Sequence, residues 1–415
     1  MLRMDLVTEE VEIARVAAAL PKSPIVAFDL EFASADRLIP VLCLLQVSWL
    51  DEDQHRRFDA ADPKSVAEIA PTARLIDPMS ADIGPIVAAL AAHPLVVAHA
   101  PRQDLGLLAV RYGLTEMPGL IDTQLMAAFA GLGDQIGLAT LANDLLGTNL
   151  GKDQQWTAWE RRPLTAAQLA YAVADVRYLH ALHALFATKL GATRLGWVRA
   201  ESQQILADAL AAAAVTPETA WHQLGGLRAL EPLAQAGARV LAEWRQRTAI
   251  ALDRPLGQVL ADKNLFELAR NRPRDAGSVR ALKGIAPIAK THADEILAVL
   301  ATANADGITP RGAPPRAASA RAQRWAEMLL AIAHVIADEA HISPRLLSTR
   351  GDAEHFARTA DEQGLDATAS LPARATWRGE LLGSAWAGWL AGTVAIVGDP
   401  SSPGGVQLRY DQPVQ

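Results

Sequence analysis

Cysteine is nearly absent from this chain, since Cys43 is the one cysteine among 415 residues. An intramolecular disulfide is therefore excluded, and the fold must be stabilised by packing. Such a composition is typical of a reducing compartment, so we expect a cytoplasmic protein. Cys43 lies in the apolar stretch VLCLLQVSW, which predicts a small buried side chain rather than a nucleophile.

Long uncharged stretches are also scarce. The first twenty residues contain three glutamates, so we do not expect a signal peptide there. The segment from Leu381 to Gly398 has no charged residue, and its length approaches that of a membrane-spanning helix. Because four glycines, a serine and a threonine lower its hydrophobicity, we expect a buried final helix that runs into a loop, and no membrane association.

A strongly basic composition is missing as well, because the formal net charge is −7. The charge is nevertheless uneven: from Arg239 to Lys290 we count eleven Lys and Arg against five Asp and Glu, a local excess of +6. A nucleic-acid partner is therefore not excluded. The length predicts about three domains, and 50% hydrophobic residues are enough for several cores.

The first half of the chain alternates strand-like and helix-like segments. A short amphipathic helix is expected over residues 1–20, and residues 51–72 look like a polar loop. Three early strands, which we expect to be antiparallel, precede a regular alternation, and this order predicts an α/β layered domain. The predicted strands are 25–33, 42–49, 74–77, 94–100 and 119–122, and the predicted helices between them are 83–92, 104–112, 123–130 and 138–146.

The second half is predicted to be almost wholly helical. It begins with a clear signal, because Thr165 and Gln168 have the spacing of a capping box that follows Pro163. Residues 304–320 are rich in Pro, Gly and Ala and read as a linker. The residues after Ser401 look like a frayed tail.

Two acids stand on the first strand, in the stretch IVAFDLEFA. Asp29 and Glu31 are two residues apart, so they point to the same face of the strand, about 7 Å apart. Neighbouring buried carboxylates repel each other and are costly to desolvate. A hard divalent cation between them would remove that cost. The alternative is a strand end at which both acids reach water.

Two later acids can meet the first pair. Asp104 follows the apolar strand LVVAHA, and Asp175 lies four residues after Tyr171 on one face of the helix that begins near Thr165. Four carboxylates at one sheet edge suit two divalent ions about 3.5–4 Å apart, an arrangement that supports in-line phosphoryl displacement. Taken singly, Asp104 could be a helix N-cap, Asp175 a solvated residue and Tyr171 a core aromatic.

These motifs together resemble ribonuclease D, in the DEDD superfamily of 3′–5′ exonucleases and its tyrosine subgroup. The matching stretches are FDLEF, HAPRQDLGLL, LIDTQLMAAF and RRPLTAAQLAYAVADVRYL. Further on, LAEWRQRTAIALDRPLGQVLADKNLFELAR is similar to the helicase-and-RNase-D C-terminal (HRDC) domain. The stretches HISPRLLSTR and WRGELL resemble a weaker second copy.

The resemblance implies an architecture. A ribonuclease H-like exonuclease domain, a mixed sheet flanked by helices, would be followed by two all-α HRDC domains. The implied boundaries are 1–205 for the exonuclease domain, 206–303 for the first HRDC domain with its connecting helix, 304–320 for the linker, 321–400 for the second, degenerate HRDC-like domain and 401–415 for the tail.

The resemblance also implies the chemistry. Asp29, Glu31, Asp104 and Asp175 would hold two divalent ions, Mg²⁺ or Mn²⁺, and Tyr171 would orient the attacking water. The reaction would release 5′-mononucleotides from RNA 3′ ends, above all in tRNA precursors and other small structured RNAs, by a monomeric enzyme. A DNA 3′–5′ exonuclease is the alternative, and an inactive nucleic-acid-binding scaffold is a further one.

Six more residues are candidates for contact with the substrate: Leu30, Gln46, His99, Arg102, Trp156 and Arg161. Leu30 stands where threonine is frequent in the family, and it should point to the face opposite both acids, which predicts a packing role. Gln46 could equally be a buried polar strand residue, and His99 a hydrogen-bonded structural histidine. Arg102 could contact a phosphate or remain solvated.

The tryptophans that precede Arg161 and Arg162 also have two interpretations. Trp156 and Trp159 could stack a base while the arginines hold phosphates, or both rings could pack in the core. Asp122, in LIDTQ, matches a family position that is not usually a ligand, so we expect a supporting role.

Overall fold

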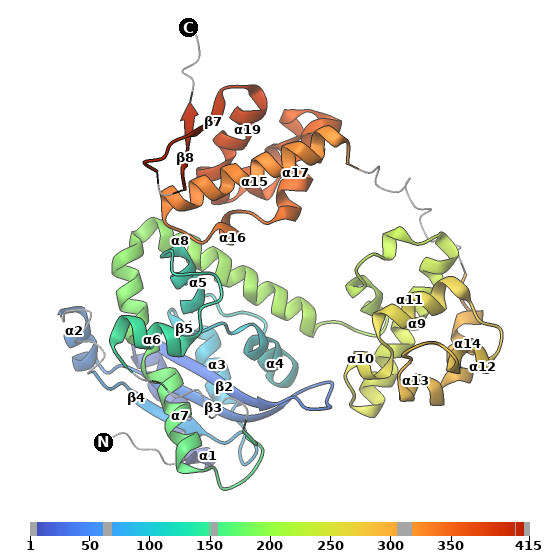
Figure 1. Cartoon of the computed structure of the whole chain (residues 1–415). Coiled ribbons are helices and arrows are strands. Elements are labelled where there is room, and N and C mark those ends of the chain that lie inside the picture. Colours follow the sequence, from blue (N-terminus) through green and yellow to red (C-terminus); the bar gives the residue numbers. More distant parts are fainter. Residues whose placement is uncertain are drawn as a thin grey trace.

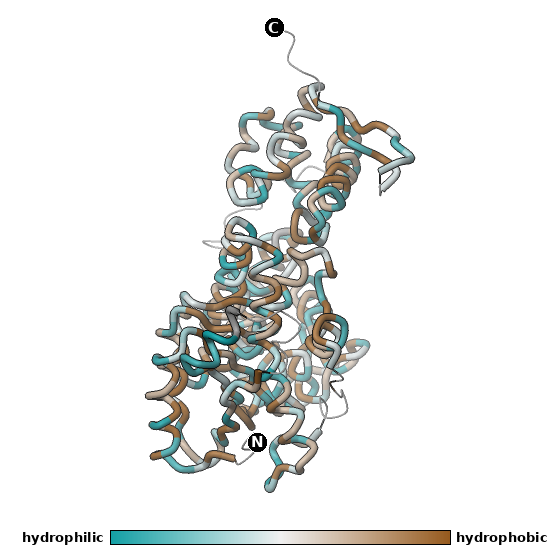
Figure 2. Tube along the Cα trace, turned by 90° about the vertical axis from the view of Figure 1, so that its left-hand side faces the viewer, coloured by the Kyte–Doolittle hydropathy of each residue, from teal (hydrophilic) through white to brown (hydrophobic). Residues whose placement is uncertain are grey.

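The computed structural model describes residues 6–60, 69–148, 150, 157–304, 318–402 and 404–410. The chain forms an α/β domain, a helical domain beside it and a third, mostly helical domain at the C-terminal end (Figure 1). The rotated view in Figure 2 again places the third domain at the end of the molecule away from the N-terminus. The predicted order, an α/β domain followed by helical domains, is confirmed.

A six-stranded mixed sheet forms the centre of the α/β domain, in the order β1-β4-β3-β2-β5-β6. The pairs β2–β3 and β3–β4 are antiparallel, whereas β5 runs parallel to β2 and to β6. The predicted change from antiparallel strands to strand–helix alternation is therefore confirmed. The strands are β1 (Leu6–Val7), β2 (Val26–Ala33), β3 (Val41–Trp49), β4 (Thr72–Ile76), β5 (Val96–Ala98) and β6 (Leu120–Asp122).

Helices cover both faces of this sheet. On one face, α1, α3 and α4 pack against Phe28 and Leu30; on the other, α7 packs against Leu44 and Leu75. Because side chains alternate along a strand, Asp29 and Glu31 of β2 lie on the face that α7 covers. The helices are α1 (Glu10–Ala19), α2 (Glu52–Ala60), α3 (Gly84–Ala92), α4 (Arg102–Tyr112), α5 (Thr123–Phe129), α6 (Leu138–Leu146) and α7 (Ala166–Arg177).

Two local predictions in this domain are wrong. Residues 6–7 form strand β1, paired with β4, before α1 begins at Glu10, because a two-residue edge strand leaves no periodic pattern. Part of the predicted loop 51–72 is helix α2, which starts with reciprocal hydrogen bonds between Asp51 and Gln54. This helix has almost no apolar stripe, so only its cap could have indicated it; residues 61–68 lie outside the described part.

The long helix α8 (Leu179–Ala213) continues past the predicted domain boundary. It kinks at Gly191, which has φ 66°, and its residues Leu206 and Ala209 still pack in the core of the α/β domain. The boundary predicted between residues 205 and 206 is therefore wrong. Alanine-rich helices show no change of composition where their packing partner changes, so no local marker indicates this boundary.

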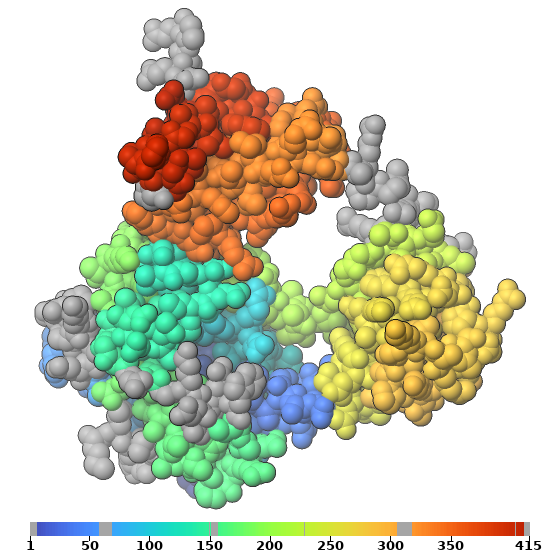
Figure 3. Space-filling model, viewed as in Figure 1, coloured from blue at the N-terminus to red at the C-terminus, as the bar shows by residue number. Residues whose placement is uncertain are grey.

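The first helical domain has its own core and also touches the turn between β2 and β3. Arg37 lies 3.3 Å from Asp253, and the Leu38 backbone N–H donates to the same carboxylate at 3.2 Å. Figure 3 shows this blue turn against the yellow-green domain, beside an opening framed by the three domains. The helices are α9 (Pro232–Leu252), α10 (Leu256–Val259), α11 (Asp262–Asn271), α12 (Ala276–Arg280), α13 (Pro287–Thr291) and α14 (Ala293–Ala301).

The third domain repeats part of the first helical domain. Its first three helices begin at residues 320, 344 and 350, and the counterparts α9, α10 and α11 begin at 232, 256 and 262, so the spacing is constant. Both long helices end on a left-handed residue, Asp253 and His341. The elements are α15 (Ala320–Ala340), α16 (Pro344–Leu347), α17 (Arg350–Gln363), α18 (Pro372–Ala375), α19 (Ser384–Ala391), β7 (Val394–Gly398) and β8 (Val406–Tyr410).

The end of the chain differs from the prediction. Residues 406–410 form β8, which pairs antiparallel with β7, so this part of the tail predicted to be frayed from residue 401 is a strand. The uncharged segment Leu381 to Gly398 divides between α19 and β7. Among the described residues, no helix combines the length and apolar character needed to cross a membrane. Most of the predicted linker 304–320 lies outside the described residues.

Candidate active site

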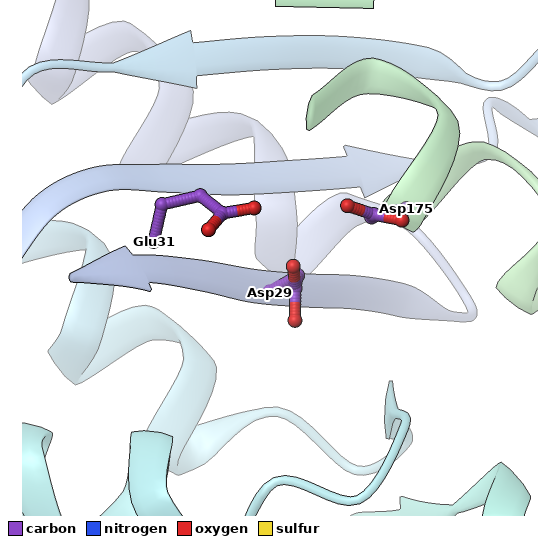
Figure 4. Close-up of side chains that lie close together, drawn as sticks. All are labelled: Asp29, Glu31 and Asp175. Atoms are coloured by element: carbon purple, nitrogen blue, oxygen red, sulfur yellow. The ribbon is translucent and has the colours of Figure 1, made fainter. Parts of the chain in front are cut away.

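Three acids converge at the centre of the sheet. Carboxylate oxygens of Asp29, Glu31 and Asp175 all lie within 4.8 Å of one another. Figure 4 shows the first two on β2 and Asp175 reaching them from α7. This confirms that the two acids of β2 and the acid of α7, which are far apart in the sequence, form one cluster.

Helix α7 is oriented by contacts at both ends. The predicted capping box is present, because Thr165 accepts from the Gln168 backbone and Gln168 accepts from the Thr165 backbone. Near its other end, the carbonyl oxygen of Val176 accepts from Ser48 of β3 at 3.0 Å. The Tyr171 hydroxyl lies close to the carboxylate of Asp175 and partly offsets the rise that burial causes in the pKa of that acid, as their spacing on one helix face predicts.

Asp104 stands beside this cluster, outside the group of three. It is 8% exposed and lies in the first turn of α4, after Ala100, which has a positive φ of 53°. The buried Asp122 carboxylate accepts from the backbone N–H of Ala100 at 2.9 Å and of Gln124 at 2.8 Å. Asp122 thereby fixes the turn that precedes Asp104, which is a supporting role.

Burial raises the pKa of every acid in the site, and the charges of neighbouring acids raise the pKa of Glu31, Asp104 and Asp175 further. Burial raises the pKa of Asp29 to about 7. Burial, followed by the charges of Asp29, Asp175 and Asp104, raises the pKa of Glu31 to about 10. The pKa of Asp175 rises to about 9 by burial and the charge of Asp29. Burial, followed by the charges of Asp29 and Asp122, raises the pKa of Asp104 well above its usual value.

This electrostatic pattern fits a divalent cation. Carboxylate oxygens without an interleaved base are the donors that hard cations prefer, and a bound cation favours the ionised form of each acid. Burial and the same acids also raise the pKa of Tyr171. The phenol therefore stays protonated near neutral pH and acts as a hydrogen-bond donor, not as a base.

We expect added Mg²⁺ to stabilise the protein more at about pH 8 than at about pH 6. In the metal-free protein Asp29, Glu31 and Asp175 hold protons that an unfolded chain, with carboxyl pKa values near about 4, releases earlier. The folded state binds more protons, so its stability falls as the pH rises from about 4 through about 7 to about 10. A cation offsets this loss, and fewer protons compete with it at higher pH.

Thermal unfolding with and without Mg²⁺ at the two pH values measures the effect. At about 100 times its dissociation constant the ion should contribute about 2.7 kcal/mol. Equal stabilisation at both pH values would show that the ion does not bind these acids.

The structure corrects two of the predicted substrate contacts. The Leu30 side chain is buried in the core against α4, on the face opposite the acids, so it packs as expected there and cannot touch RNA. Gln46 is fully buried opposite Asp29 in the β2–β3 pair. Its amide has no hydrogen-bond partner among the described residues, yet its burial removes it from any surface that RNA could reach.

The other predicted contacts divide in three ways. The His99 ring donates from Nε2 to the Ile136 carbonyl at 3.1 Å, and its Nδ1 lies 2.9 Å from Thr123 Oγ1; both nitrogens are engaged, which is a structural role. Burial lowers the pKa of His99 to about 4, so the ring is neutral. Arg102 and Arg161 have exposed side chains. Trp156 lies outside the described residues.

Sequence reasoning missed several residues around α7. Arg162 does not present itself to a phosphate, because it forms two 2.7 Å hydrogen bonds with the buried Asp77 carboxylate at the end of β4. Ser48 also lies 2.8 Å from His180 Nε2. None of these pairs has a local motif; only a buried polar residue within an apolar strand could have signalled Ser48.

Comparison with known proteins agrees with this site. Residues 4–191 match the 3′–5′ exonuclease family and residues 235–300 match the HRDC domain. The chain is 32% identical over 385 residues to ribonuclease D of Acidiphilium cryptum (strain JF-5), which covers 90% of this chain and 89% of the relative. The chain belongs to the ribonuclease D family.

Further members of the ribonuclease D family align over nearly the whole chain. The protein from Jannaschia sp. (strain CCS1) is 31% identical over 404 residues, or 94% of this chain and 96% of the relative. The crystal structure of Escherichia coli RNase D, described as an exoribonuclease involved in structured RNA processing, superposes with a TM-score of 0.76. It shares 25% identity, covering 94% of this chain and 99% of that one.

Membership of the ribonuclease D family establishes the activity. The chain is a 3′–5′ exoribonuclease, and its acid cluster makes catalysis dependent on a divalent metal ion. Residues 235–300, within α9 to α14, form an HRDC domain, so the first of the two predicted HRDC domains is confirmed.

Proposed function

We propose that this enzyme uses two divalent ions, Mg²⁺ or Mn²⁺, to release 5′-mononucleotides from RNA 3′ ends, and that tRNA precursors and other small structured RNAs are its substrates. The observation that carries the proposal is that carboxylate oxygens of Asp29, Glu31 and Asp175 lie within 4.8 Å of one another. Asp104 lies beside them, and the Tyr171 hydroxyl lies close to Asp175. We place it in the cytoplasm as a monomer, with the lone buried Cys43 in support of the location.

The four acids, Asp29, Glu31, Asp104 and Asp175, would hold the two ions. When bound, the ions would supply acidity to the attacking water and neutralise charge on the scissile phosphate. Tyr171 would keep its proton and orient the water through its hydroxyl, which lies close to the carboxylate of Asp175.

A cavity of about 420 Å³ between the end of β2 and the first turn of α4 offers a place for the RNA 3′ end. Phe32, which follows Glu31, and Arg102 and Gln103, which precede Asp104, line it together with apolar side chains of α4 and α8. Apolar walls suit unstacked bases, and a cationic rim suits a phosphate. We infer that Arg102, now 3.0 Å from exposed Asp208, binds an RNA phosphate there.

Arg102→Ala should weaken RNA binding several-fold and lower the slope of log affinity against log salt by about 1. Filter binding or fluorescence anisotropy over a salt series measures both quantities. Arg15→Ala is the matched control, because Arg15 is an exposed arginine on α1 that does not line the cavity. An unchanged slope in the Arg102 variant would mean that this arginine meets no phosphate.

We also propose that the third domain is a second, degenerate HRDC-like copy. The constant spacing of α15–α17 relative to α9–α11 supports this. Residues at equivalent positions are buried in both copies, for example Leu241 and Leu329, or Leu268 and Phe356. In the first helical domain, Arg239 lies over the Trp221 ring and Arg270 lies over the Phe266 ring. We propose that the basic segment 239–290, which contains both arginines, binds the RNA backbone.

The function is tested with purified protein, a 3′-extended tRNA and a labelled linear RNA, each with Mg²⁺, Mn²⁺ or a chelator. We expect metal-dependent shortening from the 3′ end with mononucleotide products. A matched DNA oligomer degraded as fast as RNA would favour a DNA exonuclease instead. Binding without shortening of any 3′ end would indicate an inactive scaffold.

A further inference from the structure

The loop that enters α7 is held to the sheet by one arginine. Besides its two bonds to Asp77, Arg162 donates from Nη2 to the Cys43 carbonyl at 2.7 Å and from Nη1 to the carbonyls of Trp159 and Arg161 at 2.8 and 2.9 Å. Burial alone would raise the pKa of Asp77, yet the Arg162 hydrogen bonds lower it. The carboxylate therefore stays ionised, and the bidentate pair is of the strong, geometrically specific kind.

The side chain that this loop presents is Trp159. It is 3% exposed and packs between the sheet and α7, among Leu75, Leu164 and Val173. Its ring centroid lies 6.1 Å from that of Tyr171, with the planes at 43°. The indole therefore forms one wall of the position that the Tyr171 ring occupies.

A second hydrogen bond joins the loop to the helix. Gln168, which completes the capping box of α7, donates to Thr157 Oγ1 at 3.0 Å. A displacement of residues 157–162 would therefore be passed to the first turns of α7. Tyr171 lies one turn further on, with its hydroxyl close to the carboxylate of Asp175.

We propose that Trp159, held by the Arg162–Asp77 pair, is a positioning residue that sets the ring orientation of Tyr171 for catalysis. This inference rests on the proposed role of Tyr171 in orienting the water. The hydroxyl is the atom of the Tyr171 side chain farthest from the backbone, so a small rotation of the side chain about χ1 displaces it appreciably. A displacement of about 1 Å at a reacting group can cost about 100-fold in rate.

Trp159 can be substituted without loss of a side-chain hydrogen bond. Its indole N–H has no hydrogen-bond partner among the described residues, so a substitution breaks no hydrogen bond and leaves no newly unpaired polar group. Trp159→Leu removes the aromatic wall, whereas Trp159→Phe keeps a ring against Tyr171. Trp386→Leu is the control, since Trp386 is also fully buried but lies in the third domain, outside the basic segment 239–290.

The decisive experiment is a double-mutant cycle with Tyr171→Phe, measured on RNA with Mn²⁺ in the full-length enzyme. We expect Trp159→Leu to lower kcat by about 10- to 100-fold with KM unchanged, and Trp159→Phe to restore most of it. In the Tyr171→Phe background the same Trp159→Leu change should alter kcat by less than about two-fold. Trp386→Leu should leave kcat unchanged in both backgrounds.

The possible outcomes separate the two hypotheses. An equal loss of kcat in both backgrounds would overturn the inference, because Trp159 would then act through something other than Tyr171. If Tyr171→Phe alone retains full activity, the proposed role of Tyr171 fails and the inference fails with it. Should Trp159→Leu not fold, Arg162→Lys replaces it: it loses the bidentate contact to Asp77 and should show the same dependence on Tyr171.

Discussion

Asp29→Asn should abolish exonuclease activity and at the same time raise the melting temperature of the metal-free protein. Asp29 has a carboxylate oxygen within 4.8 Å of those of Glu31 and Asp175, and its charge raises the pKa of each of the other three acids. Loss of an outer contact to a metal ligand typically costs about 10- to 100-fold in affinity or activity. Loss of a ligand itself should therefore cost more than about 100-fold, and added Mg²⁺ should no longer stabilise the variant.

The gain in stability follows from the pKa of Asp29. Burial raises it to about 7, far above the value near about 4 of an unfolded chain. Ionised Asp29 therefore destabilises the metal-free fold, and this cost grows as the pH rises from about 4 to about 7. A neutral asparagine of the same shape removes it, so the melting temperature should rise by several degrees at about pH 8 and not at all below about pH 4.

The measurements are the rate of 3′ nucleotide release and thermal unfolding with and without metal. Asp53→Asn is the control, because Asp53 is an exposed acid on α2 with a loose ion pair to Arg56; it should change neither quantity. Retained activity in a pure Asp29→Asn sample would falsify the metal assignment. A lower melting temperature at about pH 8 would contradict the electrostatic account of the site.

Trp377→Ala should lower the free energy of unfolding of the whole protein, by about 3–5 kcal/mol. Trp377 belongs to the third domain but stacks on Trp197 of α8 at 5.2 Å and meets Phe129 of α5 edge-on at 5.0 Å. Its indole N–H donates to Glu201 of α8 at 2.8 Å, and Arg378 holds the same carboxylate in a bidentate pair. The third domain and the exonuclease domain thus share one core.

Denaturant unfolding and hydrogen exchange of α5 and α8 measure this effect. We expect faster exchange in both exonuclease-domain helices as well as in the third domain, since the shared core opens on both sides. Trp325→Ala is the matched control. Trp325 is a half-buried residue of α15, and the guanidinium group of Arg321 lies 5.0 Å from its ring centroid. This substitution should lower the free energy of unfolding by less than Trp377→Ala does. Destabilisation confined to the third domain would mean that the two domains fold independently.

Local signals in the sequence were enough to find most of the site. Asp29 and Glu31 alternate with buried apolar residues on a strand, and that alternation alone puts both carboxylates on one face. The capping box at Thr165 marks where α7 starts, and the four-residue spacing then places Tyr171 beside Asp175. Each of these features depends on residues within a few positions of one another, which is why they can be read before the fold is known.

What only the tertiary structure decided are contacts between distant segments. Arg162 looked like a phosphate-binding residue until the end of β4 brought Asp77 to it, and Trp159 looked free to stack a base until the sheet and α7 closed over it. The predicted domain boundary is wrong because α8 still packs against α4 beyond residue 205. The prediction of a frayed tail is wrong because β8 pairs with β7. Pairing of this kind depends on which surfaces meet after folding, and no residue near Asp77, Trp159 or Val406 in the sequence specifies its partner.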